Sequence, residues 1–132
     1  MSGIKDLDIL LSNIEPILDK DEFIFCTFPD YNSGQLTRLQ PIGFFKEKEG
    51  ITFIITKESA ISEKISFDST YCLISLNVHS SLEAVGLTAA VSTKLAEKNI
   101  SANVVAAYYH DHIFIPADKA EQAMKALIEL QK

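Results

Sequence analysis

The side chains of this sequence best suited to holding a small ligand lie between Asn77 and Gly86. The segment reads Asn-Val-His-Ser-Ser-Leu-Glu-Ala-Val-Gly, and it separates an apolar run from a helical pattern that begins at Leu87. The first turn of a helix exposes backbone N–H groups that have no partner within the helix, and the helix dipole adds positive potential there. Such a position binds a carboxylate or a phosphate without any catalytic side chain. The segment therefore predicts a small-anion site, at which Gly86 lets the ligand or a neighbouring backbone approach closely.

A second interpretation of this segment needs no ligand. Ser80 and Glu83 are three residues apart, which is the spacing of a capping box. If the helix begins at Ser81, Gly86 lies inside it and costs about 1 kcal/mol relative to alanine. The segment would then do no more than start a helix, and both interpretations stay open at the level of sequence.

Three histidines, His79, His110 and His112, raise the question of a metal site. No cysteine or carboxylate stands near them at a spacing typical of metal ligands, and Asp111 between the last two is typical of a turn whose side chain bonds its own backbone. His79 and Ser80 are adjacent in sequence, which does not make a nucleophile and its base. We therefore expect no metal, no cofactor and no enzymatic activity, with a histidine-based metal enzyme as the least favoured alternative.

The composition limits the classes of partner. The chain has 132 residues, of which 47% are apolar, and a net charge of −6. This charge disfavours nucleic acid and anionic membranes, because both recruit basic surfaces. No run approaches the roughly 20 apolar residues that span a bilayer, and Cys26 and Cys72 lie in apolar runs, as small buried side chains do in a reducing compartment. We expect a cytoplasmic protein.

The hydrophobic pattern predicts an alternation of helices and strands. Steps of three and four predict helices, whereas aromatic and β-branched runs predict strands. Asp118 and Glu121 have the spacing of a capping box at the last helix. The expected elements are a helix over 4–14, a strand over 22–28, a long loop over 29–40, a hairpin of 42–47 and 51–56, a helix over 57–64, a strand over 71–78, a helix over 87–98, a hairpin of 102–109 and 112–115, and a helix from Pro116.

The two halves of the sequence repeat each other. Ile54 to Ala60 matches Phe114 to Ala120 at an offset of 60 residues, and both segments join the end of a strand to the start of a helix. Helices that alternate with hairpins predict an α+β fold in which helices pack on one face of an antiparallel sheet.

The second half resembles the ACT domain family. The resemblance rests on Val85-Gly-Leu-Thr-Ala89, followed by Leu95-Ala-Glu-Lys-Asn-Ile-Ser101, and it covers roughly Tyr71 to Leu130. The whole chain also resembles small stand-alone bacterial ACT-like proteins, whose signature includes the segments here numbered 79–88 and 108–112. Members of the family are ferredoxin-like βαββαβ modules that regulate enzymes of amino-acid metabolism. The sequence departs from two full modules, because it shows no first strand before Ile4 and no last strand after Lys132.

The resemblance implies a function and a site. It implies a non-catalytic regulatory or sensor protein, made of ACT-like halves over 1–68 and 69–132, that holds an amino acid at an interface and forms a homodimer. The competing class is an interaction or oligomerisation module that has no ligand. Asn103 would join the site if its strand lay beside 71–78. The expected ligand-binding residues are Asn77, His79, Ser80, Ser81, Val85, Gly86, Leu87 and Asn103.

Overall fold

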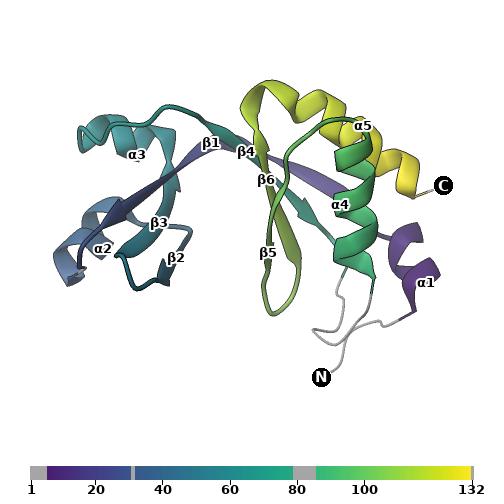
Figure 1. The fold of residues 1–132 in the computed structure, drawn as a ribbon, viewed down its shortest axis with the longest axis horizontal. Coiled ribbons are helices and arrows are strands. Elements are labelled where there is room, and N and C mark those ends of the chain that lie inside the picture. The colour runs from purple at the N-terminus through teal and green to yellow at the C-terminus, as the bar shows by residue number, and fades with distance from the viewer. Residues whose placement is uncertain (1–5, 31, 79–85, 132) are drawn as a thin grey trace. The chain divides into compact units, whose positions relative to one another are not determined.

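The computed structural model describes residues 6–30, 32–78 and 86–131 (Figure 1). The chain forms two compact units, which we call unit 1 (Met1–Lys20 with Cys72–Lys132) and unit 2 (Asp21–Tyr71). Of the N-terminal segment, the described residues 6–20 belong to the same unit as the C-terminal part of the chain; the sequence-based division between residues 68 and 69 stays a prediction. Among the described residues, no helix is long and apolar enough to cross a membrane.

Unit 2 is a three-stranded antiparallel sheet with two short helices. Its strand order is β2-β3-β1, and Phe25 of β1 stands opposite Ile54 of β3. Every second residue of β3 is buried, and these side chains meet Leu39 and Ala60 from the helices in a core of their own. The elements are β1 (Pro16–Phe28, of which residues 21–28 belong here), α2 (Ser33–Leu39), β2 (Gly43–Lys46), β3 (Ile51–Thr56) and α3 (Lys57–Ser62).

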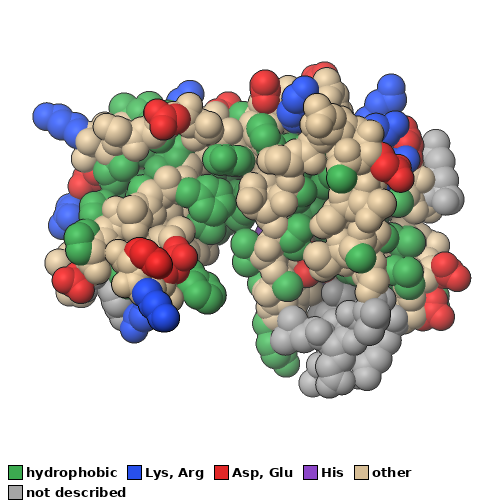
Figure 2. All heavy atoms as spheres, viewed as in Figure 1, with side chains coloured by type: hydrophobic (Ala, Val, Ile, Leu, Met, Phe, Trp, Pro, Cys, Tyr) green, Lys and Arg blue, Asp and Glu red, His purple; other side chains and the backbone are tan. Residues whose placement is uncertain are grey.

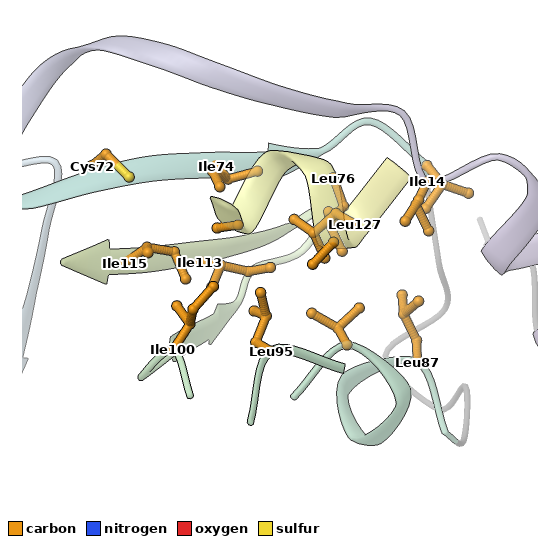
Figure 3. Packing of buried hydrophobic residues seen from close by; sticks show 14 of the residues in the cluster. Ile14, Cys72, Ile74, Leu76, Leu87, Leu95, Ile100, Ile113, Ile115 and Leu127 are labelled. Atoms are coloured by element: carbon orange, nitrogen blue, oxygen red, sulfur yellow. The ribbon is translucent and has the colours of Figure 1, made fainter. Parts of the chain in front are cut away.

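Unit 1 is a four-stranded sheet whose strand order is β1-β4-β6-β5. Side chains of alternate residues of β4 and β6 point to the same side and meet those of α4 and α5 in a larger core, in which Ile74, Leu95 and Leu127 are fully buried (Figure 3). The elements are α1 (Leu7–Ser12), the first residues of β1, β4 (Tyr71–Leu76), α4 (Leu87–Glu97), β5 (Asn103–Ala106), β6 (Asp111–Pro116), the 3₁₀ turn η1 (Ala117–Lys119) and α5 (Ala120–Leu130).

The strand that the sequence of the second half lacks comes from the beginning of the chain. β1 lies next to β4 in unit 1, and the backbone N–H of Asn77 donates to the carbonyl of Ile14 at 2.7 Å. The order β1-β4-β6-β5 is that of a ferredoxin-like sheet in which the fourth strand precedes the other three in sequence. The predicted α+β, ferredoxin-like class is therefore confirmed.

The predicted repeat is also present, with a strand in front of each copy. Unit 2 contributes β1-α2-β2-β3-α3, and unit 1 contributes β4-α4-β5-β6-α5. β3 begins at Ile51 and β6 at Asp111, which keeps the offset of 60 residues found in the sequence. Equivalent positions of the two units can therefore be compared residue by residue.

The loop predicted over residues 29–40 is wrong, because Ser33–Leu39 forms helix α2. Its seven residues include Ser, Gly and Thr, which have low helix propensity. A capping box compensates: Asn32 accepts from the Gln35 N–H, and the Gln35 side chain accepts from the Asn32 N–H, both at 2.9 Å. Burial of Leu39 fixes the other end of the helix.

Other boundaries also differ from those predicted. β1 begins at Pro16 rather than at Glu22, and α1 covers only Leu7–Ser12 of the expected helix, whose first residues lie outside the described part. The capping box predicted for the last helix is wrong as well, since neither η1 nor α5 has a side-chain cap. The chain winds through the 3₁₀ turn before α5, so Asp118 does not occupy the N-cap position.

Candidate functional site

Helix α4 begins without a capping side chain. Its N-cap is Gly86, which has φ 99° and ψ −17° and no side chain with which to accept from the first turn. The Gly86 carbonyl accepts from the Ala90 N–H at 2.8 Å, which is the first hydrogen bond of the helix. Among the described residues, no side chain caps the N–H groups of this first turn, and such groups are commonly satisfied by solvent or a ligand. The alternative capping pair, Ser80 and Glu83, lies outside the described residues.

Gly86 has a structural role of its own. Its φ of 99° lies in the left-handed region, and a Cβ built on it would stand 3.2 Å from the Cδ2 of Leu7 in α1. Glycine is therefore required both by the backbone conformation and by the close approach of α1. A valine at this position would disturb the fold as well as any ligand, so it would be a poor probe of binding.

Asp111 is the one buried charged side chain among the described residues, and only 8% of its surface is exposed. Burial raises the pKa of its carboxyl, and the neighbouring charges of His112 and His110 oppose this rise. No hydrogen bond is among the causes that shift the pKa of Asp111. The carboxylate is therefore largely but not completely shielded from water, since no fully buried side-chain oxygen lacks a hydrogen-bond partner in the described part of the protein.

The start of α4 and Asp111 line the same hollow in unit 1. The hollow is narrow, with an empty volume of about 160 Å³ and no room for a water molecule in its present shape. Thr88 and Asp111 supply its polar atoms, and the remaining walls are apolar. The lining residues are Leu76, Leu87, Thr88, Val91, Val104, Asp111 and Ile113.

His110 and His112 are held by separate hydrogen bonds. Nδ1 of His112 lies 2.7 Å from the Ser75 hydroxyl, and Nδ1 of His110 lies 3.3 Å from the Val78 carbonyl. Burial lowers the pKa of His112, His110 lowers it further, and Asp111 raises it. The two rings are 6.4 Å apart. No group of three or more potential metal ligands occurs in the described residues, and His79 lies outside them.

The residues that the sequence predicts to bind a ligand do not all lie together in the structure. Gly86 and Leu87 form the start of α4 beside the hollow. Asn103 lies on β5, which β6 separates from β4, and its amide donates to the Phe114 carbonyl at 3.4 Å. Asn77 directly follows the last residue of β4 and is exposed. The predicted residues His79, Ser80, Ser81 and Val85 lie outside the described part of the chain.

Sequence reasoning missed Asp111 as a member of this site. Its neighbours in sequence, two tyrosines and two histidines, are typical of a polar turn. In the structure it is the first residue of β6 and stands opposite Ala106, so that its side chain turns toward the core. The 60-residue repeat contained the signal, because it pairs Asp111 with the buried Ile51.

Comparison with known proteins assigns both halves of the chain to the same family. ACT domain models match residues 2–72 and residues 68–129. A protein of unknown function from Vibrio cholerae, described as a possible transport protein, is 46% identical, with a TM-score of 0.86, over 99% of this chain and 100% of that chain. A search of curated proteins found no match.

More distant structures share the fold. Aspartate kinase from Clostridium acetobutylicum has a TM-score of 0.67 at 12% identity, over 91% of this chain and 36% of that chain. The regulatory subunit of aspartate kinase from Thermus thermophilus has a TM-score of 0.61 at 13% identity, over 89% of this chain and 97% of that chain. Matched by ACT domain models along nearly its whole length, this chain belongs to the ACT domain family of regulatory modules.

Proposed function

We propose that this protein is a non-catalytic sensor that binds a free amino acid at the start of α4 in unit 1. One observation carries the proposal: the uncapped start of α4 and the largely buried carboxylate of Asp111 line the same hollow. An amino acid is a zwitterion, so its carboxylate suits the N–H groups of α4 and its ammonium suits Asp111. Neither group alone would satisfy both ends of the site.

The energetics favour a ligand that brings a cation. A buried polar group without a partner costs roughly 1–3 kcal/mol, and a charged group costs more. Binding of an ammonium group would compensate for the water that the Asp111 carboxylate has lost on burial, whereas a simple carboxylic acid would only add a like charge near it. The site therefore selects amino acids over their deaminated analogues.

Binding would also change the conformation. The hollow has no room for a water molecule, so its apolar walls, which include Leu87 and Val104, must part before an ammonium group reaches Asp111. The amino acid then stabilises the open arrangement over the closed one, which is regulation by population shift. We keep His79, Ser80, Ser81 and Val85 as proposed contributors from the β4–α4 connection, and we assign no contact to Asn77 or Asn103.

We also propose a homodimer in the cytoplasm. Oligomers are common in the family, and β2 stands at the edge of its sheet with Phe45 72% exposed. Neither Cys26 nor Cys72 forms a disulfide within the described chain, in keeping with a reducing compartment. Light scattering should give twice the mass of one chain for the wild type, and Phe45→Lys should shift it toward the monomer. A monomeric wild type at micromolar concentration would contradict the dimer.

The binding proposal is tested with a panel of the twenty common L-amino acids, each at 10 mM, and their 2-hydroxy acid counterparts. At least one amino acid should raise the melting temperature of the wild type, and its 2-hydroxy counterpart should not. Asp111→Asn should lose this response, because a neutral amide pairs poorly with an ammonium group. Asp118→Asn is the matched control, since Asp118 is exposed on η1, and it should respond as the wild type does.

Two outcomes would favour other classes of protein. Silence of the wild type toward all twenty amino acids would sink the sensor proposal and favour a pure interaction module. A stoichiometric transition metal in the purified protein, found by elemental analysis and lost in His110→Asn, would favour the histidine-based alternative.

A further inference from the structure

We propose a second binding site in unit 1, in the groove between the end of α4 and the face of α5, for a small oxyanion that carries at least two negative charges. The groove has a volume of about 270 Å³, close to the lower end of the roughly 300–1,000 Å³ of typical ligand sites. Its lining residues are Lys98, Gln122, Lys125, Ala126 and Glu129.

The groove exists because of one small residue. Ala126 is 1% exposed and belongs to the core of unit 1, so it forms the floor, while longer side chains on either side form the walls. Gln122 lies one turn before Ala126 on the same face of α5 and offers an amide donor. Apolar floor, amide donor and lysine walls together suit a compact anion.

Three lysines surround a single carboxylate here. Nζ of Lys94 lies 2.6 Å from Oε1 of Glu129, and Nζ of Lys98 lies 3.9 Å from the same oxygen. The hydrogen bond from Lys94 lowers the pKa of Glu129, the charges of Lys94, Lys98 and Lys125 lower it further, and partial desolvation opposes them. Lys94 and Lys98 share the single negative charge of Glu129, so the three lysines exceed the carboxylate by two positive charges.

This local excess of two positive charges contrasts with a net charge of −6 for the whole chain. The negative end of the α4 dipole, next to Lys98, offsets part of it. Glu121, one turn before Lys125 on α5, is exposed and forms no ion pair with it in the described chain. Figure 2 shows basic side chains beside acidic ones at the upper right, over the region that α5 occupies in Figure 1.

The groove is independent of the amino-acid site. Lys98 follows Gly86 by twelve residues, which is about 18 Å along a helix at 1.5 Å per residue. The two sites therefore lie at opposite ends of α4, and a substitution in one leaves the contacts of the other in place. Failure of one proposal does not bear on the other.

The test is a titration with pyrophosphate, followed in ¹H–¹⁵N NMR spectra at fixed ionic strength. Saturable shifts are expected at the amides of residues 98 and 122–129. The double variant Lys98→Gln/Lys125→Gln should weaken the affinity at least ten-fold, while Lys94 still joins α4 to Glu129. The control Lys57→Gln/Lys64→Gln removes two exposed lysines from unit 2 and should bind as the wild type does. Absence of saturable shifts below 10 mM, or equal weakening in both double variants, would overturn the proposal.

Discussion

The two units use one arrangement of strands and helices, yet they begin the equivalent helices in opposite ways. Helix α2 of unit 2 has a complete capping box, in which Asn32 and Gln35 satisfy each other's backbone N–H groups. Helix α4 of unit 1 starts at Gly86 and has no side-chain cap. The fold therefore does not require an open helix start, and unit 1 alone keeps one.

The first residues of the equivalent strands differ in the same sense. Ile51 of β3 and Asp111 of β6 are each 8% exposed and hold the same place in the repeat. Isoleucine belongs to the core cluster of unit 2, whereas aspartate places a largely buried carboxylate in unit 1, where burial raises its pKa. Stability alone favours the isoleucine. Because perturbed titratable groups cluster at functional sites, we propose unit 1 as the binding half and unit 2 as the scaffold half.

The substitution that should destabilise the protein most places a carboxylate at the equivalent position of unit 2. Ile51→Asp removes a buried apolar side chain and places a charge where no ligand relieves it, so it should lower the free energy of unfolding by about 3 kcal/mol or more. Urea denaturation followed by circular dichroism measures the change. Ile51→Val is the control and should cost only about 1 kcal/mol. If Ile51→Asp lowered the free energy of unfolding by less than about 1 kcal/mol, position 51 would not be buried in the way that position 111 is.

The next effect concerns the start of α4. Gly86→Ala forces a side chain into the left-handed region and against Leu7, which should destabilise the protein by about 2 kcal/mol. Gly43→Ala, in β2, is the control, because Gly43 has no positive φ and a Cβ built on it would make only an ordinary contact, 3.9 Å from the Cδ1 of Ile54. Equal melting temperatures for Gly86→Ala and the wild type would contradict a left-handed backbone at Gly86.

A smaller effect is expected when the capping box of α2 is removed. Asn32→Ala leaves the Gln35 N–H without its acceptor and should cost about 1 kcal/mol. It should have no influence on amino-acid binding, because the cap lies in unit 2. Hydrogen exchange at residues 35–39 would show the fraying directly. Unchanged exchange there would mean that burial of Leu39, rather than the cap, holds the helix.

The smallest effect is the pH dependence of stability at Asp111. Its folded pKa is raised by burial, so the folded state binds the proton more tightly than the unfolded state. This contribution to stability is fully present below the ordinary pKa of aspartate and is lost as the pH rises through the folded pKa. Asp111→Asn should therefore be more stable than the wild type at neutral pH, by at most about 1 kcal/mol, since the amide also lacks a partner.

The gain in Asp111→Asn should shrink as the pH falls toward 4, where the wild-type carboxyl takes up its proton. The charges of His112 and His110 lower the pKa of Asp111 and therefore make the difference smaller. Thermal melts from pH 4 to pH 8 follow the trend. A gain that grows toward low pH would show that the sign assigned to Asp111 is wrong.

Much of the fold was predictable from the sequence because its strands have strong patterns. The alternation of buried and partly exposed residues in β3 and the four-residue repeat of Leu87, Val91 and Leu95 in α4 each predict one element type. The charged middle of β1, residues 19–22, is exposed on both faces, so it lacks any alternation and its strand was predicted too short. Helix α2 was missed because only its cap, and no apolar periodicity, marks it.

The site was predictable in part. The sequence drew attention to Gly86 and to the helical pattern after it, but left open a capped helix start at Ser81; the structure places the N-cap of α4 at Gly86. Asp111 is distant from Gly86 in sequence and reaches the hollow only through the strand order, in which β6 lies beside β4. Such a contact depends on tertiary structure and leaves no local signal.

We propose that unit 1, and not unit 2, binds an amino acid. A ¹H–¹⁵N NMR titration of the full chain, with the L-amino acid that raises the melting temperature most in the panel, tests this difference between the units. We expect saturable shifts at the amides of residues 87–89 and 110–112, and none at residues 33–36 at the start of α2. Shifts at the start of α2, or shifts that leave residues 87–89 and 110–112 unmoved at saturation, would contradict it.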